Sequence, residues 1–253
     1  MKKIIIVLFA FAIAISPSFV NANELKKVKL AESEKYIKTT TIMDAAAMYA
    51  YSSDTVNRAE SYSEEVTEEE YNSAQTRDLV LQGSSIIETT YKKMTTAIWD
   101  IGGAYQYVNL LHWKIMPQIR SFDIIAIGFP NSVKVSGTPL YSQTYCLSSD
   151  GSCYTSNSFA PKVETRGASG LFKVIGDSIT VCDITLWFNI EKNTPYTIYT
   201  LYAYGDYSHA TTPLSYESAQ NYTVNGGGIQ LGSSIYNNYD SISSTDVTAS
   251  VNW

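Results

Sequence analysis

From about Leu79 to the C-terminus, apolar and polar residues alternate, and this period of two constrains the fold more than any other feature of the chain. One face of the segment that begins at Tyr105 carries aromatic and aliphatic side chains and the other carries polar ones, which is the pattern of a half-buried strand with Trp113 in the core. The first group is Tyr105, Tyr107, Leu111 and Trp113, and the second is Gln106, His112 and Lys114. Thr, Tyr, Val and Ile are abundant, and clusters of Gly, Asn, Asp and Ser interrupt them at roughly ten-residue intervals. No helical pattern alternates with these segments, so an antiparallel β-sandwich is favoured over a βαβ arrangement.

The clearest single element is a long hairpin. Ser85–Asp100 and Ala104–Met116 flank Ile101-Gly102-Gly103, whose glycines can adopt the positive φ angles of a tight turn. Pro117 ends the second arm, and the next segment is apolar on both faces in its second half, which predicts a central strand. The further strands are expected at Arg120–Phe129, Ser132–Ser136, Gln143–Leu147, Gly170–Ile175, Ser178–Glu191, Tyr196–Tyr207 and Asp246–Trp253.

The N-terminus has the features of a secretory signal peptide. Lys2 and Lys3 precede the apolar run Ile4–Ile15, and small residues ending at Ala22 predict cleavage there, so residues 1–22 would be removed. The apolar run is too short for a permanent span, which needs about 20 residues. We therefore expect a secreted, extracellular protein with no permanent membrane span after cleavage.

Acidic residues are concentrated in the region that follows this leader. The whole chain has a net charge of −6, which argues against nucleic acid as a partner. Residues 23–78 are predicted to form an acidic, partly helical N-terminal arm, with residues 79–253 forming the sandwich domain. Helix formers fill Ile42–Tyr51, and Thr67 with Glu70 matches a capping box for a short helix through Ala74. A propeptide or a partner-binding segment is the alternative interpretation of this arm.

The three cysteines have two predicted roles. Cys146 and Cys153 flank a loop that contains the turn signal Asp150-Gly151, and we expect a disulfide that stabilises this hairpin by roughly 2 to 3 kcal/mol. Cys182 lies in an apolar stretch and is interpreted as a small buried core residue, with a reactive or intermolecular thiol as the alternative.

Catalytic and metal-binding patterns are weak. The two histidines, His112 and His209, do not have the spacing of zinc ligands, and we expect no cofactor or metal. Ser208 and His209 are adjacent on a predicted strand and point to opposite faces, so a triad with Asp206 is not expected, and the chain has no Gly-x-Ser-x-Gly elbow. A further set of acids could in principle pair as glycosidase carboxylates, although the sequence does not show any pairing: Asp123, Asp183 and Glu191.

Aromatic residues are the strongest compositional feature, with 20 tyrosines and 4 tryptophans. Many will pack in the core, but the tyrosines of the C-terminal third are too numerous for one small core to bury, and exposed aromatics form good contact surfaces. We therefore predict a non-catalytic protein that binds carbohydrate or protein at or near the cell surface. The predicted ligand contacts are Tyr202, Tyr204, Tyr207, His209, Tyr236 and Tyr239.

Parts of the sequence are compatible with three other functions. The Thr-rich arm Thr89–Ala97 has the composition of the amphipathic strands of a pore-forming toxin, so a secreted toxin is the alternative function. The alternation that ends at Trp253 is similar to that of outer-membrane barrel strands, but several strands are apolar on both faces. A hydrolase of unknown substrate comes third.

The stretch Trp113–Phe129, preceded by Glu88–Lys93 and followed by Gly205–Thr211, resembles an uncharacterised group of secreted, β-rich proteins from Gram-positive bacteria. The resemblance covers about Ser85 to Tyr239. It implies export and a β-rich body, and it implies no particular activity. Such bacteria have no outer membrane, so the resemblance also counts against an outer-membrane barrel.

Overall fold

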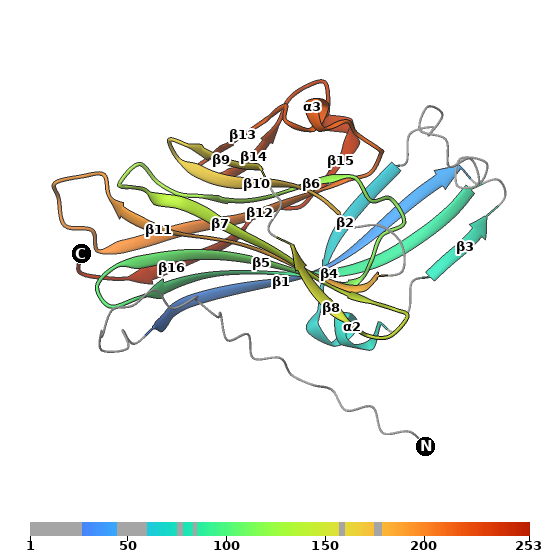
Figure 1. Cartoon of the computed structure of the whole chain (residues 1–253), viewed down its shortest axis with the longest axis horizontal. Helices are drawn as coiled ribbons and strands as arrows, with labels where there is room; N and C mark the ends of the chain where they lie inside the picture. The colour runs from blue at the N-terminus through green and yellow to red at the C-terminus, as the bar shows by residue number, and fades with distance from the viewer. Residues whose placement is uncertain (1–26, 45–59, 75–77, 83–84, 157–159, 175–178) are drawn as a thin grey trace, which may run out of the picture.

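The structure is a computed structural model that describes residues 27–44, 60–74, 78–82, 85–156, 160–174 and 179–253. These residues form an antiparallel β-sandwich of two sheets, which confirms the predicted fold class (Figure 1). A small third sheet lies on the outer face of the second layer. The predicted signal peptide, residues 1–22, lies outside the described residues.

The larger sheet has eight strands in the order β2-β1-β4-β5-β11-β7-β8, and β3 also pairs with β4. Its centre is the predicted hairpin, β4 and β5, where Gly102 and Gly103 have φ angles of 85° and 93° and both donate N–H groups to Asp100 Oδ1. The strands are β1 Val28–Asp44, β2 Glu60–Val66, β3 Asp78–Gln82, β4 Ser85–Asp100, β5 Tyr105–Ile115, β7 Val133–Leu147, β8 Cys153–Ser156 and β11 Ile179–Lys192.

The smaller sheet has the order β15-β12-β6-β10-β9, with β16 also paired to β12. One edge of strand β12 pairs with two short strands in succession: β16 pairs with Thr200–Gly205 and β15 pairs with Ser208–Ala210. The central strand β6 is buried on both faces, as its apolar sequence predicted. The strands are β6 Phe122–Gly128, β9 Ala160–Glu164, β10 Gly167–Lys173, β12 Thr200–Ala210, β15 Tyr239–Ser241 and β16 Thr245–Ser250.

The main core lies between the two sheets. Trp113, Tyr107, Phe129 and Phe188 are almost completely buried there, and the inward parity of β5 is the one that the sequence predicted. Two layers come into close contact at Gly205, where a Cβ atom would overlap Thr96 Oγ1 of the opposite sheet. Glycine is therefore required at this point because the facing sheets leave no space for a side chain.

A second, smaller core lies on the outer face of the second sheet, beneath a cap. The cap's backbone touches β6 closely enough that a Cβ at Gly128 would overlap the carbonyl oxygen of Asn225. Residues from both sides, such as Ile124, Tyr222 and Ile235, are buried between sheet and cap. The cap consists of α3 Tyr216–Ala219, β13 Tyr222–Asn225, β14 Gly228–Leu231 and the 3₁₀ turn η1 Tyr236–Asn238.

The predicted N-terminal arm is part of the sandwich where the structure describes it. Strand β1 pairs with β4 from Val28 to Asp44, so the expected boundary at residue 78 does not separate β1 and β2 from the sheet. Ile42 lies in β1 rather than in a helix, and the rest of the predicted helix Ile42–Tyr51 beyond Asp44 lies outside the described residues. The β-branched residues Thr39–Thr41 are buried in β1. Their preference for a strand outweighs the effect of the nearby charged residues, which alone would favour exposure to solvent.

Local structure in the acidic segment includes one predicted helix and ion pairs to the neighbouring strand. Helix α2, Glu68–Ser73, begins as predicted, with the Thr67 side chain accepting a hydrogen bond from the Glu70 N–H. The concentrated acids are partly neutralised, because Lys38 of β1 lies 3.1 Å from Glu64 and 3.5 Å from Glu70. Lys38 comes from a neighbouring strand, so the charge pattern of the acidic segment alone could not show this pairing.

Candidate functional site

The structure separates the six predicted ligand contacts into an exposed and a buried group. Tyr236 is 66 % exposed and Tyr202 is 39 % exposed, and Tyr204 is half-buried. The other three predicted contacts are buried, which is a correction, because they cannot touch a ligand at the surface: Tyr207, His209 and Tyr239. Beyond Tyr204 both faces of β12 are covered, the inner face by the first sheet and the outer face by the cap.

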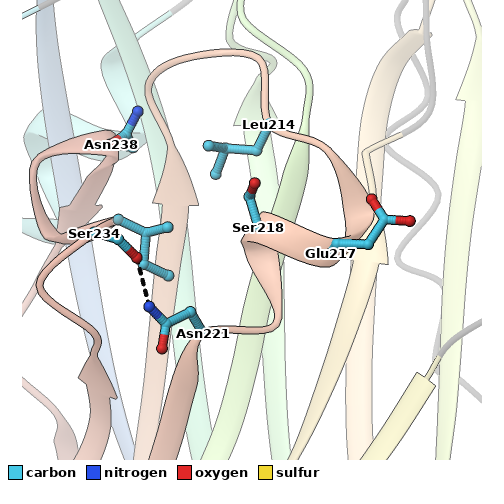
Figure 2. A pocket seen from close by; sticks show the side chains of 7 residues that line it. Leu214, Glu217, Ser218, Asn221, Ser234 and Asn238 are labelled. Atoms are coloured by element: carbon cyan, nitrogen blue, oxygen red, sulfur yellow. Dashed lines mark hydrogen bonds between the residues drawn. The ribbon is translucent and has the colours of Figure 1, made fainter.

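The cap carries an open pocket of about 400 Å³ on the surface. Asn221 donates a hydrogen bond to Ser234 across its floor, as Figure 2 shows. Two exposed tyrosines, Tyr216 and Tyr236, are adjacent in sequence to residues of its wall. The residues that line it are Leu214, Glu217, Ser218, Asn221, Ser234, Ile235 and Asn238.

A second exposed group of tyrosines lies beside the C-terminus. Tyr196, Tyr199 and Tyr202 are 77 %, 69 % and 39 % exposed. Their backbone is held in place because Ile198 and Trp253 exchange N–H to C=O hydrogen bonds and Val251 donates to the Tyr199 carbonyl. We call these three residues the C-terminal tyrosine patch.

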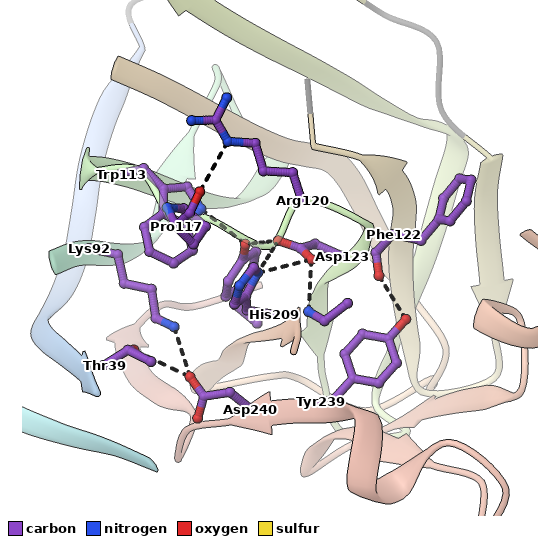
Figure 3. Close-up of polar contacts among 12 residues, drawn as sticks. Thr39, Lys92, Trp113, Pro117, Arg120, Phe122, Asp123, His209, Tyr239 and Asp240 are labelled. Atoms are coloured by element: carbon purple, nitrogen blue, oxygen red, sulfur yellow. Dashed lines mark hydrogen bonds and ion pairs between the residues drawn. The ribbon is translucent and has the colours of Figure 1, made fainter. Parts of the chain in front are cut away.

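The most unusual chemistry is inside the sandwich, where a buried polar cluster lies between the sheets (Figure 3). Asp123 of β6 is fully buried, and His209 Nδ1 lies 2.9 Å from its Oδ2. Tyr207 donates a hydrogen bond to the same carboxylate and accepts one from Trp113 Nε1 at 3.1 Å, and the Ala210 N–H also donates to Asp123. Burial and the neighbouring Asp123 raise the pKa of Tyr207 well above its usual value, so the phenol stays protonated.

Beside this group, Lys92 of β4 and Asp240 of β15 form a buried ion pair, with Nζ 3.2 Å from Oδ2. The Lys92 side chain is 0 % exposed and that of Asp240 is 3 % exposed. Ser63 and Thr39 donate hydroxyl hydrogen bonds to the same carboxylate oxygen at 2.6 and 3.3 Å. Burial raises the pKa of Asp240, but Lys92, Ser63 and His209 outweigh it and hold that pKa below its usual value.

The acids that could have formed a glycosidase pair have separate partners. Asp123 contacts His209, Asp183 lies 2.5 Å from His112 Nδ1, and Glu191 forms an exposed pair with Lys134. Asp206 accepts N–H bonds from Tyr207 and Ile229 rather than contacting His209, so the adjacent Asp206, Ser208 and His209 do not form a triad. The structure therefore does not bring these carboxylates together around a common space.

The cysteines behave as the sequence predicted. Cys146 and Cys153 form a disulfide. Cys182 is buried, Gln143 donates a hydrogen bond to its sulfur at 3.4 Å, and burial raises the pKa of the thiol to about 12. The thiolate needed for nucleophilic reactivity is therefore scarce at neutral pH.

In the described part of the chain, no group of three or more His, Cys, Asp or Glu side chains is placed to hold a metal ion. No helix in this same described part is long and apolar enough to cross a bilayer.

The residues that sequence reasoning missed are Lys92, Asp240 and the walls of the cap pocket. Lys92 shares the inward parity of β4 with Met94 and Ile98, and this parity was a signal that could have identified it as a buried cation. Asp240 lies on a strand of three residues, which is too short to show a period. Its burial depends on packing against β2 and β4, which are distant in sequence.

No protein-family model and no curated protein matches this chain. Among solved structures, the chain is similar to the C-terminal domain of the Streptococcus agalactiae antigen I/II polypeptide BspA, at 9% identity and a TM-score of 0.30 over 69% of this chain and 80% of that one. It is also similar to the collagen binding domain of the Erysipelothrix rhusiopathiae surface protein RspB, at 7% identity and a TM-score of 0.28 over 71% and 74% of the two chains.

A third similar structure is the RrgA Jo.In complex, at 11% identity and a TM-score of 0.32 over 82% of this chain and 91% of that one. These TM-scores are too low for the likenesses to bear on function.

Proposed function

We propose that the protein is a secreted, non-catalytic binding module that holds carbohydrate at or near the cell surface, with the cap pocket as its site. The observation that supports this is an open pocket with amide and hydroxyl groups in its walls and the exposed Tyr216 and Tyr236 next to it in sequence. Of the tyrosines predicted to contact a ligand, the exposed Tyr236 belongs to the proposed site, whereas the buried Tyr239 does not.

The chemistry of the pocket fits a sugar. Asn221 and Asn238 can each donate and accept hydrogen bonds, and Glu217 can accept from hydroxyl groups. Tyrosine rings offer an apolar face against which the C–H face of a sugar can pack, and they lose little rotamer entropy on binding. The pocket is open rather than enclosed, so one or a few units of a longer chain could occupy it.

The test is binding of the purified protein to a panel of immobilised wall polysaccharides and glycans. Tyr236→Ala should weaken binding at least about tenfold, equivalent to about 1.4 kcal/mol, because it removes the aromatic contact. Tyr62→Ala is the matched control, since Tyr62 is 55 % exposed on β2 of the other sheet, and it should bind like the wild type. Unchanged retention of the Tyr236 variant and of a Tyr216→Ala, Tyr236→Ala double variant would sink the proposal.

Contact with a protein is a second candidate, supported by the C-terminal tyrosine patch. Tyr196, Tyr199 and Tyr202 expose large rings within one short segment, and tyrosine is enriched in protein interfaces. If this patch binds a protein, replacing all three by alanine should abolish capture of that partner and leave glycan binding unchanged. The reverse result, with glycan binding lost, would assign the patch to the carbohydrate site.

The toxin and hydrolase alternatives have less support. Thr89–Ala97, the candidate membrane-inserting arm, lies in β4 with β1 paired on one side and β3 and β5 on the other, so insertion would require breaking both ladders. Dye release from liposomes by the purified protein would support the toxin hypothesis. Turnover of a hydrolase substrate that is lost in Asp123→Asn would support the hydrolase hypothesis.

A further inference from the structure

Lys92 and Asp240 join the two sheets of the sandwich. Lys92 lies on β4 of the larger sheet and Asp240 on β15 of the smaller one, 148 residues apart in the chain, and the two side chains meet with Nζ 3.2 Å from Oδ2. Both are almost fully buried. Removing two charges from water carries a desolvation penalty that their attraction seldom recovers completely, so a buried ion pair is by itself a poor source of stability.

The surroundings hold the two groups in one arrangement. The Lys92 Nζ atom lies 4.8 Å from the centre of the Trp113 ring and 5.4 Å from that of Tyr207, so aromatic faces enclose the cation. Ser63 and Thr39 fix the Asp240 carboxylate by hydrogen bonds to Oδ2. The ammonium and the carboxylate therefore meet at contact distance in an enclosure that bulk water does not reach.

Lys92 has a single carboxylate partner among the described residues. Asp123, the other buried acid of the cluster, is occupied by His209, Tyr207 and the Ala210 N–H. His209 of β12 lies directly opposite Asp240 of β15 and also contacts Asp123 of β6, so it lies between the two acids across the sheet (Figure 3). Any reaction of Lys92 with a carboxyl group would therefore be with Asp240.

We propose that Lys92 and Asp240 are joined by an amide bond between Nζ and Cγ, formed after the chain has folded. In this reaction Nζ attacks Cγ, the new N–C bond forms, and one carboxylate oxygen leaves. Both protons lost by the ammonium group leave on that oxygen as one water molecule, so no oxidant, reductant or further reactant is needed. The product is a neutral amide in place of two buried charges.

The fold favours this reaction because it holds the two reacting groups in contact, with Nζ 3.2 Å from Oδ2. Holding the two groups together replaces an encounter in solution, and well-oriented intramolecular reactions reach effective molarities of about 10⁵ to 10⁸ M. The proposal does not depend on the proposed binding function, because the bond would be internal to the sandwich.

The test is peptide mapping of the full chain after denaturation, reduction and digestion with trypsin. The sequence places Asp240 in the tryptic peptide Asn193–Trp253, and trypsin does not cleave after an acylated lysine. We expect a branched species in which Asp78–Lys93 is joined to Asn193–Trp253, with a mass one water molecule below the sum of the two peptides. Free Asn193–Trp253 together with cleavage after Lys92 would overturn the proposal and leave an ion pair only.

Variants separate the bond from other causes of the mass change. Lys93→Arg changes the neighbouring lysine and should leave the branched species intact, whereas Lys92→Arg keeps the charge but should eliminate it. Asp240→Asn should give a branched species of the same mass as the wild type, because ammonia leaves in place of water. The map of the wild-type protein decides the question even if a variant fails to fold.

Discussion

Two regions of the same inter-sheet core are equally buried and chemically opposite. Around Phe129, the rings of Tyr107, Phe129 and Phe188 pack with centroids 5.9 to 6.3 Å apart. The stability of this region depends on how well the shapes of the rings fit together. Around Lys92, four ionisable side chains are held by matched partners: Lys92, Asp240, Asp123 and His209. We call these the aromatic cluster and the polar cluster. The comparison indicates that the first tolerates small changes of volume, while the second fails when any partner is removed.

The largest effect is expected from Asp240→Ala. This change leaves the Lys92 ammonium buried without its counter-ion, which costs about 3 to 5 kcal/mol in the free energy of unfolding. If the amide bond is present, its loss adds up to about 5 kcal/mol, because a link across so long a loop restricts the unfolded chain. Urea unfolding of the variant and the wild type measures the difference, and a loss below about 1 kcal/mol would show that the polar cluster is as tolerant as the aromatic one.

The pH dependence of stability distinguishes two buried acids, Asp206 and Asp240. Burial raises the pKa of Asp206 to about 6, so the folded state holds its proton more tightly than the unfolded state does. Stability should therefore fall by an amount on the order of 3 kcal/mol as pH rises from about 4 through 6, and stay level above that. Without the amide bond, the lowered pKa of Asp240 acts oppositely: its contribution is complete above its unfolded pKa of about 4 and is lost at lower pH.

Unfolding by urea at a series of pH values between 4 and 8 measures this slope. Asp206→Asn does not titrate, so its stability should change less between pH 4 and 6 than that of the wild type. The comparison uses the slope rather than the absolute stability, because the amide can accept only one of the two N–H bonds that Asp206 receives. An unchanged slope in the variant would contradict the assignment to Asp206.

A smaller effect is expected from Tyr207→Phe, which removes one hydroxyl from the polar cluster. Trp113 Nε1 would lose its acceptor and Asp123 one of its donors, and an unsatisfied buried polar group costs about 1 to 3 kcal/mol. The ring itself is retained, so packing changes little. Thermal or urea unfolding measures the loss, and a neutral effect would mean that the cluster rearranges to satisfy both groups.

The sequence predicted the aromatic cluster more successfully than the polar one. Period-two alternation placed Trp113 and Tyr107 on the inward face of β5, because hydrophobic burial and strand geometry are local properties of a segment. It assigned Tyr207, His209 and Tyr239 to the surface, because it could not show that Trp113 of the opposite sheet packs against Tyr207 and His209 or that Tyr239 is buried beneath the cap. The hydrogen-bond partners of buried polar groups come from several strands, and their positions are set by the tertiary fold.

The same reasoning explains the misplaced N-terminal boundary. The acids of Glu60–Glu70 indicate solvation when they are considered alone, but Lys35 and Lys38 of β1 lie opposite them in the sheet. Strand β1 pairs along its length with β4, and this long-range pairing is invisible in either segment by itself. Charge patterning is therefore a weaker guide to folding than strand propensity where a partner strand of opposite charge exists elsewhere in the chain.

The smallest effect is expected beside the aromatic cluster, from Ile190→Val. Ile190 is buried on the same face of β11 as Phe188, and the change removes one methylene from a region with no charged group to leave unpaired. The expected loss is about 0.5 to 1.5 kcal/mol and should not vary with pH between 4 and 8. Urea unfolding at both pH values measures it. A loss above 3 kcal/mol, or one that changes with pH, would mean that the two clusters are coupled through the core and do not differ in kind.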